Sequence, residues 1–307
     1  MIPYDYPPIT PRVNLRLKQT ARLWTSYSAD FPVAQPTRYM ENNTAYGEYF
    51  RPNTDGNVPL VILSHGWGNR SVVPCKLLAR SLAKRGIACF LLYLVFHSSR
   101  LPEEVRNRLP ELTAEEWFSG YQMSVVDIRQ IIDWAITVEG ISQEHIAVMG
   151  LSLGGIISAI AMAIDERIKA GVLIVTGGNS EKIVQTSRIS AFRKHYKRSE
   201  AEYNEIQECY LRYLAEVAKR GLENVTPDMN SFLTDPLTFA HLLRQRPLLM
   251  INARWDEFIP KEATLDFWKA CDKPSISWYP ATHPSIWLWY PLILRQITGF
   301  IKSTFEQ

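Results

Sequence analysis

Short apolar runs alternate with helical patterns through most of the chain, and this alternation limits the possible folds more than any other feature. Residues 58–64, 87–93, 145–149 and 170–175 have the pattern of buried strands, and the segments between them are typical of helices. A strand followed by a helix and a second parallel strand forms a right-handed crossover. The sequence therefore predicts an α/β fold, with a mostly parallel twisted sheet of about eight strands and helices on both faces.

Two segments interrupt this alternation. Residues 1–36 are rich in proline and tyrosine and predict an irregular or partly helical N-terminal arm packed outside the main domain. Residues 177–245 show no strand pattern and predict a helical cap inserted into one domain. The α/β core would then consist of residues 37–176 and 246–307.

Local signals add detail to this outline. Alternating residues on both sides of Asn42 and Asn43 predict a β-hairpin, because asparagine tolerates the left-handed backbone of a tight turn. Capping boxes predict the first turns of two long helices (Thr113 with Glu116, Ser199 with Glu202).

Composition excludes several classes of protein. Hydrophobic residues make up 46% of the 307 residues, which is too apolar for a disordered chain, and a net charge of +3 gives no basis for binding nucleic acid. The longest apolar run, residues 87–96, has about half the roughly 20 residues of a membrane span, and the N-terminus lacks the order of a signal peptide. We therefore expect no membrane span and a cytoplasmic location.

The cysteines give no sign of a metal site. They lie far apart, with neither a CxxC pair nor the spacing of a zinc site (Cys75, Cys89, Cys209, Cys271). No metal or organic cofactor is implied. The oligomeric state is not determined, and a homodimer stays open.

One serine lies between a predicted strand and a predicted helix. Residues 148–155 read VMGLSLGG, which contains G-x-S-x-G around Ser152. The pattern alone also fits an ordinary glycine-rich turn, but the strand before it and the helix after it are the context of a nucleophile elbow. Gly150 and Gly154 would allow a sharp, strained turn that lifts the serine hydroxyl clear of the sheet.

A second glycine-containing loop follows the strand at residues 58–64. It reads His65-Gly66-Trp67-Gly68. Glycine lets this loop approach the serine turn, so that two backbone N–H groups can point at one oxygen atom. We expect Trp67 and Leu153 to supply these N–H groups as an oxyanion hole.

A serine hydroxyl becomes a useful nucleophile when a histidine accepts its proton and a carboxylate orients that histidine. His283 lies in the loop after the last predicted strand, where carboxyl-end loops converge. Asp256 follows the penultimate strand and is the expected acid. Glu257 beside it and Asp235 before that strand are the alternatives. Asp256 could instead cap a helix, an interpretation that the order Ser, Asp, His disfavours.

These four loops together resemble the α/β-hydrolase superfamily over residues 37–300. The residues that carry the resemblance are HGWG, GLSLGG, ARWDEFIP and the final THP. The details are similar to the branch of dienelactone hydrolases, acyl-esterases and prolyl-oligopeptidase-like proteins. The resemblance implies a serine hydrolase with a lid or cap in the insertion. The chain departs from common patterns at Leu153, often polar or Met, and by a single HG pair in place of HGGG. Neither change removes a backbone donor.

Aromatic and histidine residues in these loops suggest an apolar acyl pocket, although packing in the core would also explain them. The expected substrate-binding residues are His65, Gly66, His97, Trp255 and Trp287. We expect hydrolysis of small to medium carboxylic esters through an acyl-enzyme on Ser152. Thioesterase, lactonase and amidase activities need the same three residues and stay open, and a catalytically silent ligand-binding protein is the alternative from another class.

Overall fold

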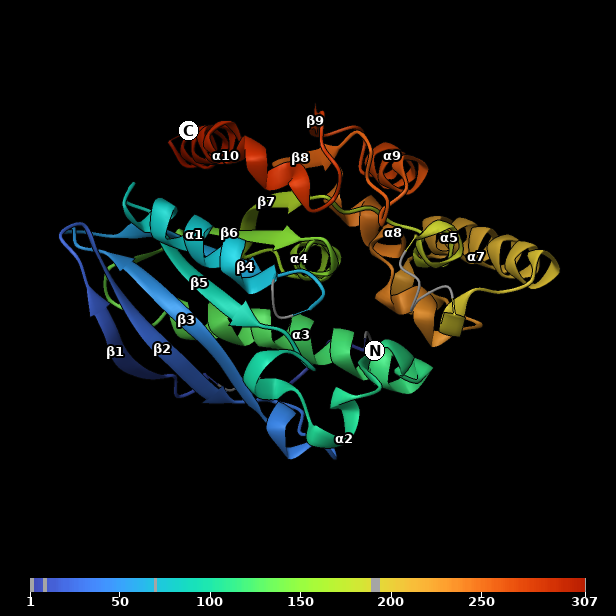
Figure 1. The fold of residues 1–307 in the computed structure, drawn as a ribbon, viewed down its shortest axis with the longest axis horizontal. Helices are drawn as coiled ribbons and strands as arrows, with labels where there is room; N and C mark the ends of the chain where they lie inside the picture. The colour runs from blue at the N-terminus through green and yellow to red at the C-terminus, as the bar shows by residue number, and fades with distance from the viewer. Residues whose placement is uncertain (1–2, 8–9, 69–70, 189–193, 307) are drawn as a thin grey trace.

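A sheet runs through the centre of the molecule. The computed structural model describes residues 3–7, 10–68, 71–188 and 194–306. Within these residues the sheet has nine strands in the order β1-β2-β3-β5-β4-β6-β7-β8-β9 (Figure 1). The strands are β1 (Asn14–Thr20), β2 (Trp24–Pro32), β3 (Thr44–Pro52), β4 (Val58–Ser64), β5 (Ala88–Tyr93), β6 (Ile141–Leu151), β7 (Ile168–Ile174), β8 (Leu248–Ala253) and β9 (Ser275–Tyr279).

Six neighbouring strands, in the order β5-β4-β6-β7-β8-β9, pair in parallel. The other three, β1, β2 and β3, pair antiparallel with their neighbours. Helices cover both faces, which confirms the predicted fold class, with nine strands where about eight are expected. The α-helices include α1 (Val72–Ala83), α2 (Glu103–Arg106), α3 (Ala114–Ala135), α4 (Leu153–Ile164), α5 (Ser180–Thr186), α7 (Glu200–Arg220), α8 (Pro236–Phe239), α9 (Lys261–Ala270) and α10 (Tyr290–Phe305).

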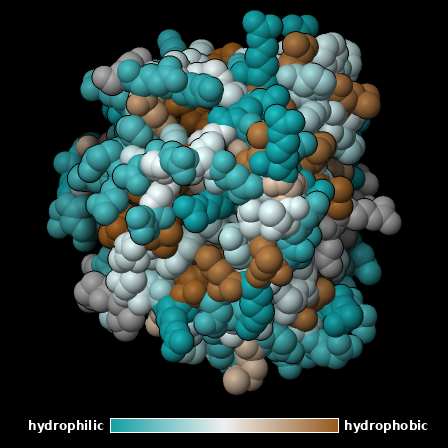
Figure 2. Space-filling view, turned by 90° about the vertical axis from the view of Figure 1, so that its left-hand side faces the viewer, coloured by the Kyte–Doolittle hydropathy of each residue, from teal (hydrophilic) through white to brown (hydrophobic). Residues whose placement is uncertain are grey.

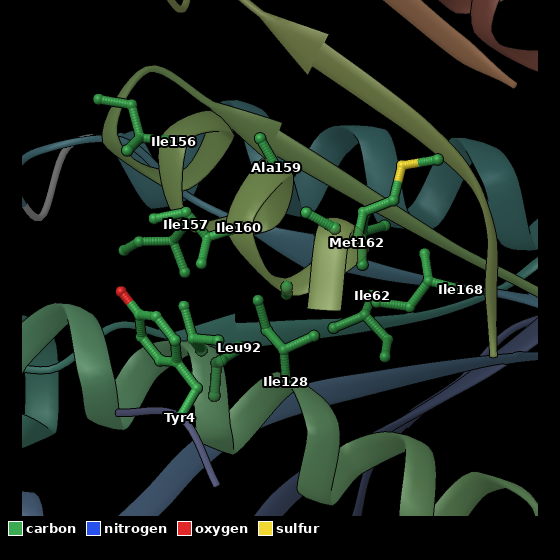
Figure 3. Close-up of a cluster of buried hydrophobic side chains, with 14 of the residues drawn as sticks. Tyr4, Ile62, Leu92, Ile128, Ile156, Ile157, Ala159, Ile160, Met162 and Ile168 are labelled. Carbon is green, nitrogen blue, oxygen red and sulfur yellow. The ribbon is translucent and has the colours of Figure 1, made fainter. Parts of the chain in front are cut away.

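The central strands are buried on both sides. Along β4, Leu60 and Ile62 belong to one apolar core, whereas Val61 and Leu63 belong to the other. This alternation is the two-residue period of a strand, and it explains why the sequence of β4 is apolar without interruption. Side chains of α3, α4 and α9 fill the first core, and those of α1 and α10 fill the second. Figure 3 shows part of the first core, where Ile62 lies near Ile128 of α3.

The prediction of an irregular N-terminal arm is wrong. Residues 14–32 instead form β1 and β2, which extend the sheet by two antiparallel strands. All seven residues of β1 are exposed. Leu15 and Leu17 alternate with polar residues, but neither is buried, so the strand depends on its pairing with β2 and not on a buried apolar face. This strand forms the edge of the sheet and carries Arg16 and Lys18. Charged side chains on an edge strand discourage pairing with another chain. Figure 2 shows that hydrophilic and hydrophobic side chains are interspersed on this side of the molecule.

The hairpin predicted around Asn42 and Asn43 is also wrong. Residues Met40–Asn42 form a short 3-10 helix, and β3 starts at Thr44 and pairs with β2. Asn42 is buried, and its side-chain oxygen accepts a hydrogen bond from the backbone N–H of Phe96 at 3.2 Å. This asparagine therefore serves a tertiary contact and not a tight turn.

The segment 177–245 contains helices and short turns and no strand among its described residues. Figure 1 shows α5 and α7 beyond the carboxyl ends of β6 and β7. Both predicted capping boxes are present, at Thr113 with Glu116 and at Ser199 with Glu202. Among the helices of the described ranges, none combines the length and the apolar character that crossing a membrane requires.

A buried ion pair holds the loop after β5. Arg100 is fully buried, and its guanidinium donates to Oδ2 of Asp127 in α3 at 2.6 Å. The same group donates to the backbone oxygens of Tyr93 and Asn42, each at 3.0 Å. Burial raises the pKa of Asp127, and Arg100 opposes this effect. The pair therefore joins β5, α3 and the segment before β3.

Replacing Arg100 by methionine should destabilise the protein by about 3–5 kcal/mol, because the charge of Asp127 would lose its partner in the interior. The free energy of unfolding, measured in denaturant, tests this. The double variant Arg100→Met, Asp127→Leu removes both charges and should recover most of the loss. A double variant as unstable as the single one would contradict this account.

Candidate active site

Ser152 lies in the turn between β6 and α4. Its backbone has φ +52° and ψ −117°, a conformation that is strained for a residue with a side chain. Its N–H donates to the backbone oxygen of Ile174 at 2.8 Å. Its carbonyl oxygen accepts a hydrogen bond from Oγ1 of Thr176 at 3.0 Å. These contacts with the last residue of β7 and with Thr176, two residues beyond it, hold the turn in place, as a nucleophile elbow requires.

The glycines around Ser152 are required by close backbone contacts. A Cβ atom on Gly150 would overlap the carbonyl oxygen of Gly154, and a Cβ atom on Gly154 would overlap the carbonyl oxygen of Ser64. The strand β6, the helix α4 and the end of β4 thus meet where no side chain fits. The G-x-S-x-G pattern reflects this contact directly.

The loop after β4 packs against the serine turn. A Cβ atom on Gly66 would lie 3.2 Å from Cβ of Ser152 and 3.3 Å from the backbone oxygen of Leu151. Leu153 is the first residue of α4, and the first N–H groups of a helix have no acceptor within the helix. The structure therefore places both predicted donor segments, at Trp67 and at Leu153, beside Ser152.

His65 holds this loop from behind. It is fully buried, its Nδ1 lies 2.7 Å from the backbone oxygen of Gly66, and its Nε2 accepts a hydrogen bond from the N–H of Leu94 at 3.1 Å. Burial lowers the pKa of His65 to about 3, so the ring stays neutral. The prediction that His65 contacts the substrate is wrong, because its ring has no exposed surface and both nitrogens bind backbone groups.

His97 packs between the rings of His65 and Trp67, with centroid distances of 5.1 and 5.3 Å. It is 2% exposed, and Nδ1 lies 2.9 Å from the backbone oxygen of Val95. Its neighbours Phe96 and Ser98 have φ values of +63° and +52°. Burial lowers the pKa of His97 to about 4. The neutral imidazole of His97, held in a strained loop, thus packs against the ring of Trp67 and supports it.

Two predicted pocket residues differ in their surroundings. Trp255 is 63% exposed, whereas Trp287 is partly buried and packs against the core shared by α1 and α10.

Sequence reasoning missed Trp117 of α3, whose ring stacks on Trp67 at a centroid distance of 4.9 Å. Its indole N–H donates to the hydroxyl of Tyr196, which links the insertion to this side of the site. Trp117 falls inside a regular helix, so no local signal distinguishes it from a core residue.

His283 and Asp256 form an oriented pair. Nδ1 of His283 lies 2.9 Å from Oδ1 and 2.8 Å from Oδ2 of Asp256. Oδ1 of Asp256 also accepts the backbone N–H groups of Phe258 and Ile259 at 2.9 and 2.8 Å. The carboxylate is therefore fixed, and it selects the tautomer in which Nδ1 carries the proton and Nε2 is free to act as a base.

The two alternative acids have other partners. Glu257 accepts the backbone N–H of His283 at 3.1 Å, so it supports the loop and not the ring. Asp235 is buried and accepts backbone N–H groups at the start of α5 and of α8, including that of Leu237 at 2.9 Å. Of the three predicted carboxylates, Asp256 is the one placed against the imidazole.

These residues gather at one edge of the sheet. Ser152, Asp256 and His283 follow the carboxyl ends of β6, β8 and β9, which run in parallel. The acid and base loops are joined by a hydrogen bond of 3.0 Å from the N–H of Trp255 to the backbone oxygen of Ala281. In the described ranges, no three histidine, cysteine or acidic side chains come together as a metal site would need.

Comparison with a family model decides the family. The model, described as alpha/beta hydrolase fold, matches residues 59–280. The chain belongs to the α/β-hydrolase fold family. A comparison with curated protein sequences gives no significant match.

Solved structures of the same fold include several esterases. An acetyl xylan esterase from Paenibacillus sp. R4 is 20% identical with a TM-score of 0.66, over 95% of this chain and 89% of that one. Acetyl xylan esterase 1 from Thermoanaerobacterium sp. JW/SL YS485 is 17% identical with a TM-score of 0.63, over 97% and 89%. A cold-adapted esterase from an Arctic intertidal metagenomic library is 15% identical with a TM-score of 0.61, over 94% and 100%. Likeness at these identities establishes the fold of this α/β-hydrolase.

The buried histidine His65 should make stability depend on pH. Its folded pKa of about 3 lies below the ordinary value of 6.5, so between these values the unfolded chain binds more protons and stability falls as pH falls. From pH 7 to pH 5 the loss from this group should be roughly 2 kcal/mol. Unfolding curves of wild type and His65→Gln test this. The variant should show a shallower pH dependence, and parallel pH profiles would refute the assignment.

Proposed function

We propose that this α/β-hydrolase is a serine hydrolase that cleaves carboxylic esters with small to medium acyl groups. The observation that carries the proposal is the Asp256–His283 pair, which leaves Nε2 of His283 free at the sheet edge where the strained turn presents Ser152. A histidine oriented by a carboxylate and a serine in a sharp turn are the combination that activates a hydroxyl.

In the proposed reaction, Oγ of Ser152 attacks the ester carbonyl while Nε2 of His283 accepts the hydroxyl proton. Asp256 stabilises the imidazolium that forms. The oxyanion of the tetrahedral intermediate accepts hydrogen bonds from the N–H groups of Trp67 and Leu153. His283 then donates the proton to the departing alcohol, and a water molecule, deprotonated by the same histidine, hydrolyses the acyl-enzyme.

The surroundings of Ser152 favour a modest acyl group. Gly66 lies against the serine turn, and the ring of Trp67 packs between His97 and Trp117, so large aromatic side chains stand close to the loop beside Ser152. We propose that Trp255 and Trp287 contact other parts of the substrate, and that residues 177–245 act as a cap. The esterases among the similar structures support an ester as the substrate. The same three residues could also hydrolyse thioesters, lactones or amides. Hydrolysis rates on these substrates, measured beside rates on p-nitrophenyl esters, distinguish the four activities.

Replacing Ser152 by alanine should abolish labelling by a fluorophosphonate probe and lower ester turnover by about 10⁴-fold or more, because the nucleophile is lost. Turnover is measured on p-nitrophenyl esters from acetate to palmitate, with the highest rates expected at the short and medium chains. Ser303→Ala, at the exposed end of α10, is the matched control. A folded wild-type protein that takes no label would instead be a ligand-binding member of the family.

Asp256→Asn should lower kcat by about 10⁴-fold while the protein stays folded, because an amide cannot hold the required tautomer or stabilise the imidazolium. Glu257→Gln is the neighbouring control. It keeps an acceptor for the N–H of His283, so its kcat should fall less than about tenfold. Equal losses in the two variants would show that the acid has been assigned to the wrong residue.

A further inference from the structure

Two helices on one face of the sheet carry the same pattern on their outer surfaces. Along α1 the outward residues Val73 and Leu77 are followed by Arg80 and Lys84. Spacings of three and four residues place all four side chains on one side of a helix. Val73 and Leu77 are 69% and 48% exposed, so α1 presents two apolar and then two basic side chains to solvent.

The C-terminal segment repeats this order. Leu288, in the 3-10 helix η8 (Ser285–Trp289), and Leu292 of α10 are 83% and 49% exposed. The exposed residues Arg295 and Lys302 follow them along α10. Each segment thus begins with exposed apolar side chains and continues with basic ones.

The two patterns form one surface, which we name the α1–α10 face (Val73, Leu77, Arg80, Lys84, Leu288, Leu292, Arg295, Lys302). The hydroxyl oxygen of Tyr290 lies 3.1 Å from the backbone oxygen of Leu77 and 2.6 Å from Oγ of Ser81, so the helices are in contact. Figure 1 shows α1 and α10 on the same side of the sheet. Because each helix follows a strand of the same direction, both start at the sheet edge that carries Ser152 and His283. The apolar pairs therefore lie toward that edge.

The charge of this face is not balanced. Residues 71–86 and 281–305 contain no aspartate or glutamate. Among the ion pairs of the described residues, none includes Arg80, Lys84, Arg295 or Lys302, whereas Lys76 on the same helix pairs with Glu48. Exposed apolar side chains beside unpaired basic ones are the chemistry of a surface that meets anionic amphiphiles.

We propose that the α1–α10 face binds an anionic lipid surface, with Val73, Leu77, Leu288 and Leu292 among the acyl chains and the basic residues against the headgroups. Insertion removes exposed apolar side chains from water, and each basic residue near an anionic surface adds attraction. A second copy of the chain is disfavoured, because a twofold contact through this face would bring its unpaired cations together.

Sedimentation with phosphatidylcholine vesicles, with and without phosphatidylglycerol, tests this on the Ser152→Ala variant, so that the result does not depend on hydrolysis. Binding should require the anionic lipid and weaken as salt is added. Arg295→Gln with Lys302→Gln should weaken binding about 25-fold, roughly fivefold for each charge removed. Leu288→Gln with Leu292→Gln should weaken it at least about tenfold.

Matched controls lie on other helices. Leu211→Gln replaces a leucine of α7 that is 59% exposed, and Lys269→Gln replaces an exposed lysine of α9. Both should bind vesicles as the parent protein does, and circular dichroism verifies the fold of every variant. Equal binding to neutral vesicles, no binding to anionic ones, or equal losses in controls and test variants would each overturn the proposal. So would a dimer that the leucine variants dissociate in the absence of any vesicle binding, because this would assign the face to self-association.

Discussion

The strained turn at Ser152 exists because three backbone segments meet where no side chain fits. The carbonyl oxygen of Ser64 at the end of β4 occupies the space that a Cβ atom on Gly154 would need, and the oxygen of Gly154 does the same for Gly150. This contact sets the distance between β4, β6 and α4. It brings the loop at Gly66 against the serine, and the location of both proposed oxyanion donors follows from it.

Buried polar groups then fix the loops around this contact. His65 ties the loop after β4 to the N–H of Leu94, and Arg100 ties the loop after β5 to Asp127 in α3. Apolar residues of similar volume could give comparable stability at such places. Polar groups also fix the orientation of each loop, because each hydrogen-bonding group has a specific partner. Trp67 is consequently held between His97 and Trp117 on a scaffold that resists displacement.

The base and its acid depend on a different part of the chain. Asp256 accepts two backbone N–H groups of its own loop and uses both oxygens toward His283, while Glu257 supports the backbone of the histidine loop. Adjacent carboxylates in one loop thus have separate tasks. The parallel direction of β6, β8 and β9 brings this loop to the same edge as Ser152.

Local sequence determined the central strands and the helices with capping boxes, because the apolar period and the cap residues act over a few neighbouring residues. It also predicted Ser152, His283 and the loop of Asp256, because each directly follows a strand pattern. It did not reveal β1, whose seven residues are all exposed and owe their conformation to pairing with β2. Nor did it separate Asp256 from Glu257, find Trp117, or show that His65 is buried behind its loop. Those outcomes depend on contacts between segments far apart in the chain, and only the tertiary structure decided them.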